Sequence, residues 1–364
     1  MSLSAVPTEI VKVFDPRIDV LKDREYVITK GAQKVSYIPY KSLSTGSSSM
    51  SFNVIPPSRN TFVDRKMFVE STISMTFTVN IPTNYTLDGD IVTPDQDAPR
   101  SFPLSRALAS ATATIGNTNV SMQTGDVIDA LLRTMKKDDL KDYNDGCPTA
   151  LDRSQTYDAN IPNPGLNVLA TRTNPILSDG EYSRGYFNVT VGPCVKPAGA
   201  GVATQTVEFK VFEPVMLSPF VFSKMNHSSL IGLQNITLVY NFAQNASELV
   251  WSGTRPQIVN QAGEKSDANV TVQVNFAPTG STVTDAQLWV GYYSPSALME
   301  IPKQVNYNFY EVQRFLTNGF SPMIYNNIET INSNNIQLKV IPSSFYVVFV
   351  GLKVYKDTTN LIAI

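Results

Sequence analysis

The sequence predicts an all-β protein, because strand-like alternation recurs along much of it. The clearest case runs from Val69 to Val79, where apolar side chains occupy most of the odd positions and polar side chains lie between them. A period of two is typical of a strand with one buried face. The same alternation returns in residues 206–211, 236–242 and 270–276. These repeated segments, separated by turn residues, favour antiparallel sheets.

The first part of the chain divides into an arm and a β-rich unit. Residues 1–48 show little periodicity, so we expect an extended arm that packs on a neighbour or stays mobile. The first unit is expected over residues 49–247. It opens with a strand that ends at Pro56 and Pro57, and it continues through residues 104–120, which contain a Gly116-Asn117 turn signal.

One helix is expected after Thr124. Apolar residues recur there at helical spacing, Thr124 is a suitable N-cap, and Lys136 and Lys137 lie near the expected C-terminal end. The helical positions are Val127, Ile128, Leu131, Leu132 and Met135. Segments rich in Pro, Asn, Gly and Thr over residues 147–179 and 192–201 predict long surface loops.

The later part of the chain predicts a second β-rich unit. Residues 248–268 read as a linker, and the second unit is expected over residues 269–364. Its strands include an alternating aromatic segment from Tyr307 to Phe315 and a pair over residues 336–341 and 345–355. Since these residues supply too few strands to close a sandwich, the second unit is expected to be incomplete, or to pair with something outside the sequence.

Composition restricts the function classes. The 364 residues are 42% hydrophobic but only 16% charged, and the formal net charge is -2. Because neutralising phosphates needs unbalanced cations, we expect no sequence-specific nucleic-acid binding. The sequence shows neither a signal-peptide pattern nor an apolar run long enough to span a bilayer, so we expect no transmembrane segment.

The residue inventory does not favour an enzyme, and we assign no catalytic, cofactor-binding or metal-binding residues. The sole histidine, His227, lies in a polar loop with no triad pattern around it. Nucleotide-binding glycine motifs are absent from the sequence. The charged run Lys136–Asp142 could hold calcium, but a solvated helix end is the favoured interpretation. Cys147 and Cys194 are expected to be reduced rather than joined in a disulfide.

Three segments of the first unit together resemble a known family. They are SFNVIPPSRNTFVDRKMFVESTISMTFTV from Ser51, FPLSRALASATATIGNTNVSM from Phe102, and EFKVFEPVMLSPFVF from Glu208 followed by LIGLQNITLVYNF from Leu230. In this order they resemble the first half of the double jelly-roll major capsid proteins of icosahedral viruses, the lineage of the adenovirus hexon and of Polinton-like viruses. The segment NIQLKVIPSSFYVVFVGLKVY from Asn335 is similar to a strand pair of such proteins.

The resemblance implies both a fold and a function. The fold would be two jelly-roll β-sandwich domains side by side, with one short helix in the first domain and a partial second domain. The chain would be a structural capsid protein of the virion, assembled in the host cell into pseudo-hexameric trimers that contact neighbouring capsomers and a penton protein. No enzyme activity and no cofactor are implied.

Two alternatives remain open from the residues. One is a single jelly-roll capsid or spike protein with a protruding β-domain. The other is a carbohydrate-binding adhesive β-sandwich, in which aromatic side chains form a sugar platform. The aromatic candidates are Trp251, Trp289, Tyr292 and Tyr293, for which core packing is the favoured role.

Overall fold

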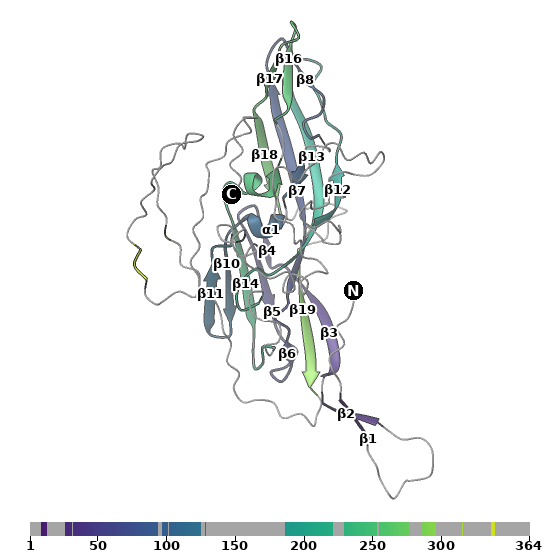
Figure 1. Ribbon diagram of the computed structural model, residues 1–364, viewed down its shortest axis with the longest axis vertical. Coiled ribbons are helices and arrows are strands. Elements are labelled where there is room, and N and C mark those ends of the chain that lie inside the picture. Colours follow the sequence, from purple (N-terminus) through teal and green to yellow (C-terminus); the bar gives the residue numbers. More distant parts are fainter. Residues whose placement is uncertain are drawn as a thin grey trace, which may run out of the picture.

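Strands dominate the protein, which confirms the predicted all-β class (Figure 1). The computed structural model describes residues 9–12, 26–30, 32–93, 97–100, 102–124, 128, 186–220, 229–252, 255–276, 286–295, 315 and 336–338. The body of the expected helix after Thr124, the expected loop over 147–179 and nearly all of residues 296–364 fall outside these ranges. Within the described part of the chain, no helix is long and apolar enough to cross a membrane.

A five-stranded antiparallel sheet forms one layer of the fold. Its strand order is β11-β10-β14-β5-β4, so strands far apart in the sequence lie side by side. The strands are β4 (Ser44–Thr45), β5 (Ser49–Val54), β10 (Leu108–Ile115), β11 (Thr118–Met122) and β14 (Ile236–Phe242). Gly116, with φ of 60°, lies in the expected turn between β10 and β11, where a left-handed backbone favours glycine.

A seven-stranded sheet forms the other layer. Its main order is β12-β13-β7-β19-β3; β18 also pairs with β7, and β6 also pairs with β19. The long strand β7 pairs along its whole length with β13, while its other edge is shared by β18 and β19. The strands are β3 (Ala32–Lys41), β6 (Phe62–Val63), β7 (Phe68–Ile81), β12 (Tyr186–Val191), β13 (Gly201–Pro214), β18 (Val270–Asn275) and β19 (Gln287–Pro295).

The two layers share one hydrophobic core. Phe52 and Leu238 of the five-stranded sheet lie in the same buried cluster as Ile73 and Val207 of the seven-stranded sheet. Buried and half-buried residues alternate along β5, β13 and most of β7, as the period-two pattern predicts. The four alternating segments named above lie in β7, β13, β14 and β18, which confirms them as strands.

Smaller elements extend the sandwich at both ends. At one end a three-stranded sheet projects, formed by β8 (Tyr85–Asp88), β16 (Gln257–Asn260) and β17 (Lys265–Asp267) (Figure 1). At the other end β1 (Glu9–Lys12) pairs with β2 (Tyr26–Lys30). The short helices α1 (Pro103–Arg106) and α5 (Ala246–Val250) and the small pair β9 (Ala98–Pro99) and β15 (Trp251–Ser252) complete the described elements.

The strand pairing differs from the expected division of the chain. Strand β3 lies inside the expected arm of residues 1–48, yet it pairs with β19 along nearly its whole length. Strands β15, β16 and β17 lie inside the expected linker of residues 248–268, and β18 and β19 lie beyond it. All of these strands pair within sheets of the first unit, which therefore reach residue 295. The division of the whole chain into domains stays a prediction.

Candidate interaction surfaces

Aromatic side chains gather on the outer face of the seven-stranded sheet, on the side away from the shared core. We call Tyr37, Phe68, Phe212, Trp289 and Tyr293 the aromatic face. Phe68 lies opposite Trp289 in the register of β7 and β19, and its ring stacks on Phe212 with centroids 4.8 Å apart. Tyr37 lies opposite Gly291, where an added Cβ would come within 3.0 Å of the Tyr37 ring. Glycine therefore lets this ring lie close over the strand.

Polar groups hold the aromatic face in place. The indole N–H of Trp289 donates to Glu70 Oε2 at 2.7 Å, and the Tyr293 hydroxyl donates to Asp64 Oδ2 at 2.8 Å. Burial and the Asp64 carboxylate raise the pKa of Tyr293, so this hydroxyl stays protonated and remains a donor. The ammonium of Lys66 lies 5.6 Å from the Phe68 ring centroid.

The other outer faces of the sandwich are polar. On the five-stranded sheet, Thr112 bonds Ser121 and the Asn241 amide donates to Ser110. Further polar residues on that face are Ser49, Ser51, Asn53, Thr114 and Thr237, with Val239 as the apolar exception. The far half of the seven-stranded sheet carries Thr76, Thr78, Thr204, Thr206 and Gln273 on its outer side. Apart from single residues such as Val239 and the exposed Val202, apolar side chains on the outer faces of the described sheets gather on one half of the seven-stranded sheet.

Strand β3 forms the edge of the seven-stranded sheet beside the aromatic face. Among the described strands only β19 pairs with it. The Ser42 N–H donates to Ala286 O on the β19 side, so the backbone groups of Val35 and Tyr37, at odd positions, point to the opposite edge. Val35 is 41% exposed and Tyr37 is 51% exposed. An edge with exposed apolar side chains is a common site of pairing with further chain.

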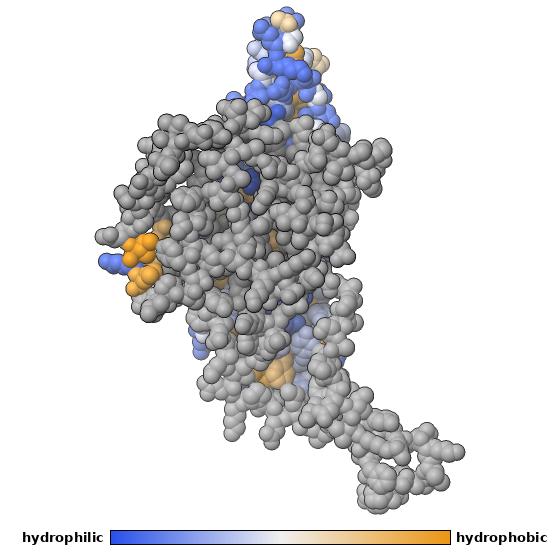
Figure 2. Space-filling model, viewed as in Figure 1, coloured by the Kyte–Doolittle hydropathy of each residue, from blue (hydrophilic) through white to orange (hydrophobic). Residues whose placement is uncertain are grey.

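The projecting sheet of β8, β16 and β17 is a polar surface. Lys265 Nζ lies 2.6 Å from Asp88 Oδ2, and the Gln257 amide donates to Asp267 Oδ1 at 2.9 Å. Figure 2 shows the tip as mostly hydrophilic. Gly263, with φ of 81°, lies in the turn between β16 and β17, so glycine in the expected linker marks a hairpin turn.

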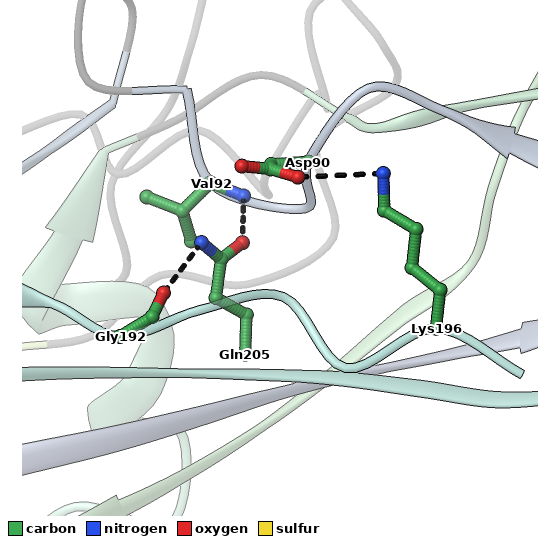
Figure 3. Close-up of polar contacts among 5 residues, drawn as sticks. All are labelled: Asp90, Val92, Gly192, Lys196 and Gln205. Carbon is green, nitrogen blue, oxygen red and sulfur yellow. Dashed lines mark hydrogen bonds and ion pairs between the residues drawn. The ribbon is translucent and has the colours of Figure 1, made fainter.

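A buried amide joins the loops at the base of this projection (Figure 3). Gln205 of β13 accepts a hydrogen bond from the Val92 N–H at 2.8 Å and donates to Gly192 O at 3.0 Å. At the surface nearby, Lys196 Nζ lies 3.4 Å from Asp90 Oδ1. The loop after β8 and the loop between β12 and β13 are therefore held together by one interior side chain.

A buried carboxylate fastens helix α1 to the seven-stranded sheet. Glu213 of β13 accepts hydrogen bonds from the Leu104 N–H at 2.7 Å and from the Ser105 N–H at 2.8 Å. The Ser105 hydroxyl also donates to it at 2.6 Å. Burial raises the pKa of Glu213 to about 7, although these donors and the charge of Arg106 oppose the shift. No pattern in the sequence singles out this residue.

The aromatic residues proposed for a sugar platform do not form one surface. Trp251 and Tyr292 are buried in the core, where Trp251 packs on Phe77 and the Tyr292 hydroxyl bonds the Tyr40 hydroxyl at 2.7 Å. Core packing is thus confirmed for these two residues. Trp289 and Tyr293 instead lie on the aromatic face, joined by three aromatic residues that the sequence reasoning missed. The sequence signal that could have found them is the alternation of β3, β7 and β13, because the positions between the buried residues of these strands include Tyr37, Phe68 and Phe212.

The remaining candidate residues are mostly outside the described ranges. His227, the run Lys136–Asp142 and Cys147 all lie there. Cys194 is half-buried and carries no disulfide. Among the residues that the structure describes, no group of three His, Cys, Asp or Glu side chains is placed to hold a metal ion.

Comparisons with known proteins identify relatives. The chain is 27% identical to V20 of Sputnik virophage, named as a capsid protein, over 348 residues that make up 95% of this chain and 55% of V20. The cryo-EM structure of the Sputnik virophage gives a TM-score of 0.56 at 25% identity, covering 83% of this chain and 56% of that chain. The mavirus major capsid protein gives 0.48 at 14% identity, covering 74% of this chain and 48% of that chain.

Two antiparallel sheets packed around one core, with loops and a small sheet at the ends, form a β-sandwich, the architecture to which the jelly rolls of viral capsid proteins belong. The chain belongs to the family of the Sputnik virophage major capsid protein, first domain, which matches residues 8–292. The expected kinship with double jelly-roll major capsid proteins is thereby confirmed. The chain spans about half the length of the relatives that it matches.

Proposed function

We propose that this protein is a structural subunit of an icosahedral viral capsid. The observation that carries the proposal is the family match over residues 8–292, which includes every strand of the two facing sheets except the end of β19. The sandwich supports it physically, because two packed sheets leave few exposed edges and form a rigid block with loops at its ends. Its place would be the shell of the virion.

The proposal extends to the mode of assembly. Subunits would form trimers of pseudo-hexameric outline, which tile the facets and contact neighbouring capsomers and a penton protein. The polar outer faces, rich in Ser, Thr and Asn, suit hydrated contacts between subunits that do not depend on one dominant charge. We propose no enzymatic activity, no cofactor and no sequence-specific nucleic-acid contact.

Assembly is the direct test. The purified protein should be examined by native mass spectrometry and by electron microscopy over a range of concentrations. Trimers that associate further into curved or closed shells are the expected result. A protein that stays monomeric at every concentration, and that binds glycans on an array, would instead favour the adhesive β-sandwich.

A further inference from the structure

The outer face of the five-stranded sheet carries no charge. The register of its strands places the outward side chains in three rows that cross neighbouring strands. The rows are Asn119, Thr114, Thr237 and Asn53; then Ser121, Thr112, Val239, Ser51 and Ser44; then Ser110, Asn241 and Ser49. No strand of this sheet contains an Asp, Glu, Lys or Arg residue. Since about 25–35% of surface residues are usually charged, a face of this size would ordinarily carry several charges.

Other outer surfaces of the described protein are charged. The outward positions of the seven-stranded sheet include Glu70 of β7 and Glu208 and Lys210 of β13. The projecting sheet carries Asp88 and Lys265, whose side chains form an ion pair. The absence of charge is therefore a property of one face, and the low charge content of the whole sequence does not explain it alone.

The polar side chains of this face are hydrogen-bonded to one another. The bonded pairs are Ser44–Ser51 at 2.7 Å, Thr112–Ser121 at 3.1 Å and Asn241–Ser110 at 3.0 Å. Covering a polar group costs less free energy when the group keeps a hydrogen bond, and covering a neutral group costs far less than covering a charge. Another surface can therefore pack on this face without burying a charge.

The size of the face sets the strength of such a contact. Strands lie ~4.8 Å apart and outward side chains repeat about every 6.8 Å along a strand, so the face covers on the order of 400 Å². With an equal area on the partner, the contact would bury roughly 800 Å² in total, at the low end for protein interfaces. One such contact is weak, and it becomes effective where many copies repeat it.

We propose that the outer face of the five-stranded sheet is a contact surface for a second copy of this protein. The inference rests on the proposed capsid role, because in a shell built of many copies the flank of one subunit meets another subunit. A charge-free face suits this partner, since copies of one chain carry the same charges and can approach here without repulsion from this side. The small area fits a contact that is repeated throughout a shell.

Photo-crosslinking tests the contact without requiring a stable dimer. The variant Val239→p-benzoylphenylalanine places the crosslinker in the middle row of the face. Val259→p-benzoylphenylalanine is the matched control, because Val259 is also a half-buried valine, on β16 of the projecting sheet. Mixing ordinary with nitrogen-15-labelled chains before irradiation distinguishes crosslinks between chains from crosslinks within a chain.

Crosslinks between differently labelled chains should form from position 239 at least several-fold more often than from position 259. This result would support the contact whether or not closed shells form. If shells form while position 239 gives only background or within-chain crosslinks, the contact is overturned and the capsid role stands. If the protein neither assembles nor crosslinks between chains, both proposals are overturned.

Inserting a charge gives an independent readout. Thr112→Lys places a cation in the middle row of the face, whereas Thr112→Asn keeps the face neutral. Because Thr112 faces outward, both variants should unfold at nearly the same urea concentration. The Lys variant should lower the yield of crosslinks between chains from position 239 at least several-fold, since the contact would bury an unpaired charge. The Asn variant should keep that yield, and equal yields in the two variants would contradict the proposal.

Discussion

Glu213 and Ser105 are joined by two hydrogen bonds inside the core, from the Ser105 N–H at 2.8 Å and from its hydroxyl at 2.6 Å. Glu213 belongs to β13 of the seven-stranded sheet, while Ser105 belongs to α1, which leads directly into β10 of the five-stranded sheet. The pair therefore links the two layers. Arg106 on α1 and Tyr240 on β14 are the other ionisable groups that interact with this carboxylate.

This link makes stability depend on pH. Because burial raises the pKa of Glu213 from 4.5 to about 7, the folded protein holds a proton in this range that the unfolded chain releases. The free energy of unfolding should therefore decrease as the pH rises from about 4.5 through 7. The difference between these two pKa values corresponds to a change in the free energy of unfolding on the order of 3 kcal/mol. Denaturant unfolding at several pH values measures it.

The variant Glu213→Gln should flatten this dependence, since its amide does not titrate. It should also be less stable at low pH, because a Gln amide N–H₂ group cannot accept from the donors on α1. Glu208→Gln, on the same strand with an outward side chain, is the control and should keep the wild-type slope. A Glu213→Gln profile parallel to that of the wild type would contradict the assignment.

The one-sided burial of β7 gives a second prediction. Phe77 is buried against Trp251, with ring centroids 5.1 Å apart, whereas Thr76 lies on the polar outer face. Phe77→Ala should lower the free energy of unfolding by about 3–5 kcal/mol through lost burial and a cavity. Thr76→Ala should cost less than about 1 kcal/mol. Urea unfolding of both variants in the same oligomeric state decides this, and equal losses would show that both faces of β7 are covered.

Gln205 gives a third prediction. Gln205→Leu would leave the buried Val92 N–H unpaired, at a cost of about 1–3 kcal/mol, and would remove the hydrogen bond to Gly192 O, which is half-buried. Amide hydrogen exchange at Val92 should become faster while exchange in β7 stays slow. Gln257→Leu removes an exposed contact to Asp267 in the projecting sheet and serves as the control. Unchanged exchange at Val92 would show that the loop does not depend on Gln205.

Periodicity predicted several of the strands, although not β3 in the expected arm, and it did not predict their partners. The alternation in residues 69–79 and 270–276 identified β7 and β18, because one buried face leaves a period of two in the sequence. The pairing of β18 with β7 could not be read in this way, since register depends on contacts between distant segments. For the same reason residues 248–268 suggested a linker, where the structure forms the β16–β17 hairpin joined to β8.

The functional surfaces were harder to predict than the fold. The sequence does not show whether an aromatic residue such as Phe212 faces the core or the outside. That becomes clear only when it is known which alternate positions of the strand are buried. Glu213 occupies one of the odd positions of β13, which face the core. A carboxylate at such a position is explained only by the backbone N–H groups of α1 that donate to it. Both features arise from tertiary contacts that one sequence does not encode locally.

The N-terminal residues give the last prediction, which separates folding from assembly. Strand β3 pairs with β19, and the Tyr40 hydroxyl bonds both Tyr292 and Ile55 O, so residues 32–41 belong to the folded sandwich. Deleting residues 1–30 removes the β1–β2 hairpin and leaves β3 in place. This deletion should keep the free energy of unfolding close to that of the full chain while weakening assembly, if the hairpin contacts a neighbouring subunit.

Deleting residues 1–45 should behave differently, because it removes β3 and exposes the edge of β19 together with Trp289 and Tyr293. We expect a clear loss in unfolding free energy and aggregation at concentrations where the shorter deletion stays dispersed. Urea unfolding and light scattering of both deletions, beside the full chain, measure the two effects. If the longer deletion were as stable as the shorter one, β3 would not be part of the fold. If the shorter deletion assembled as the full chain does, the β1–β2 hairpin would have no role in assembly.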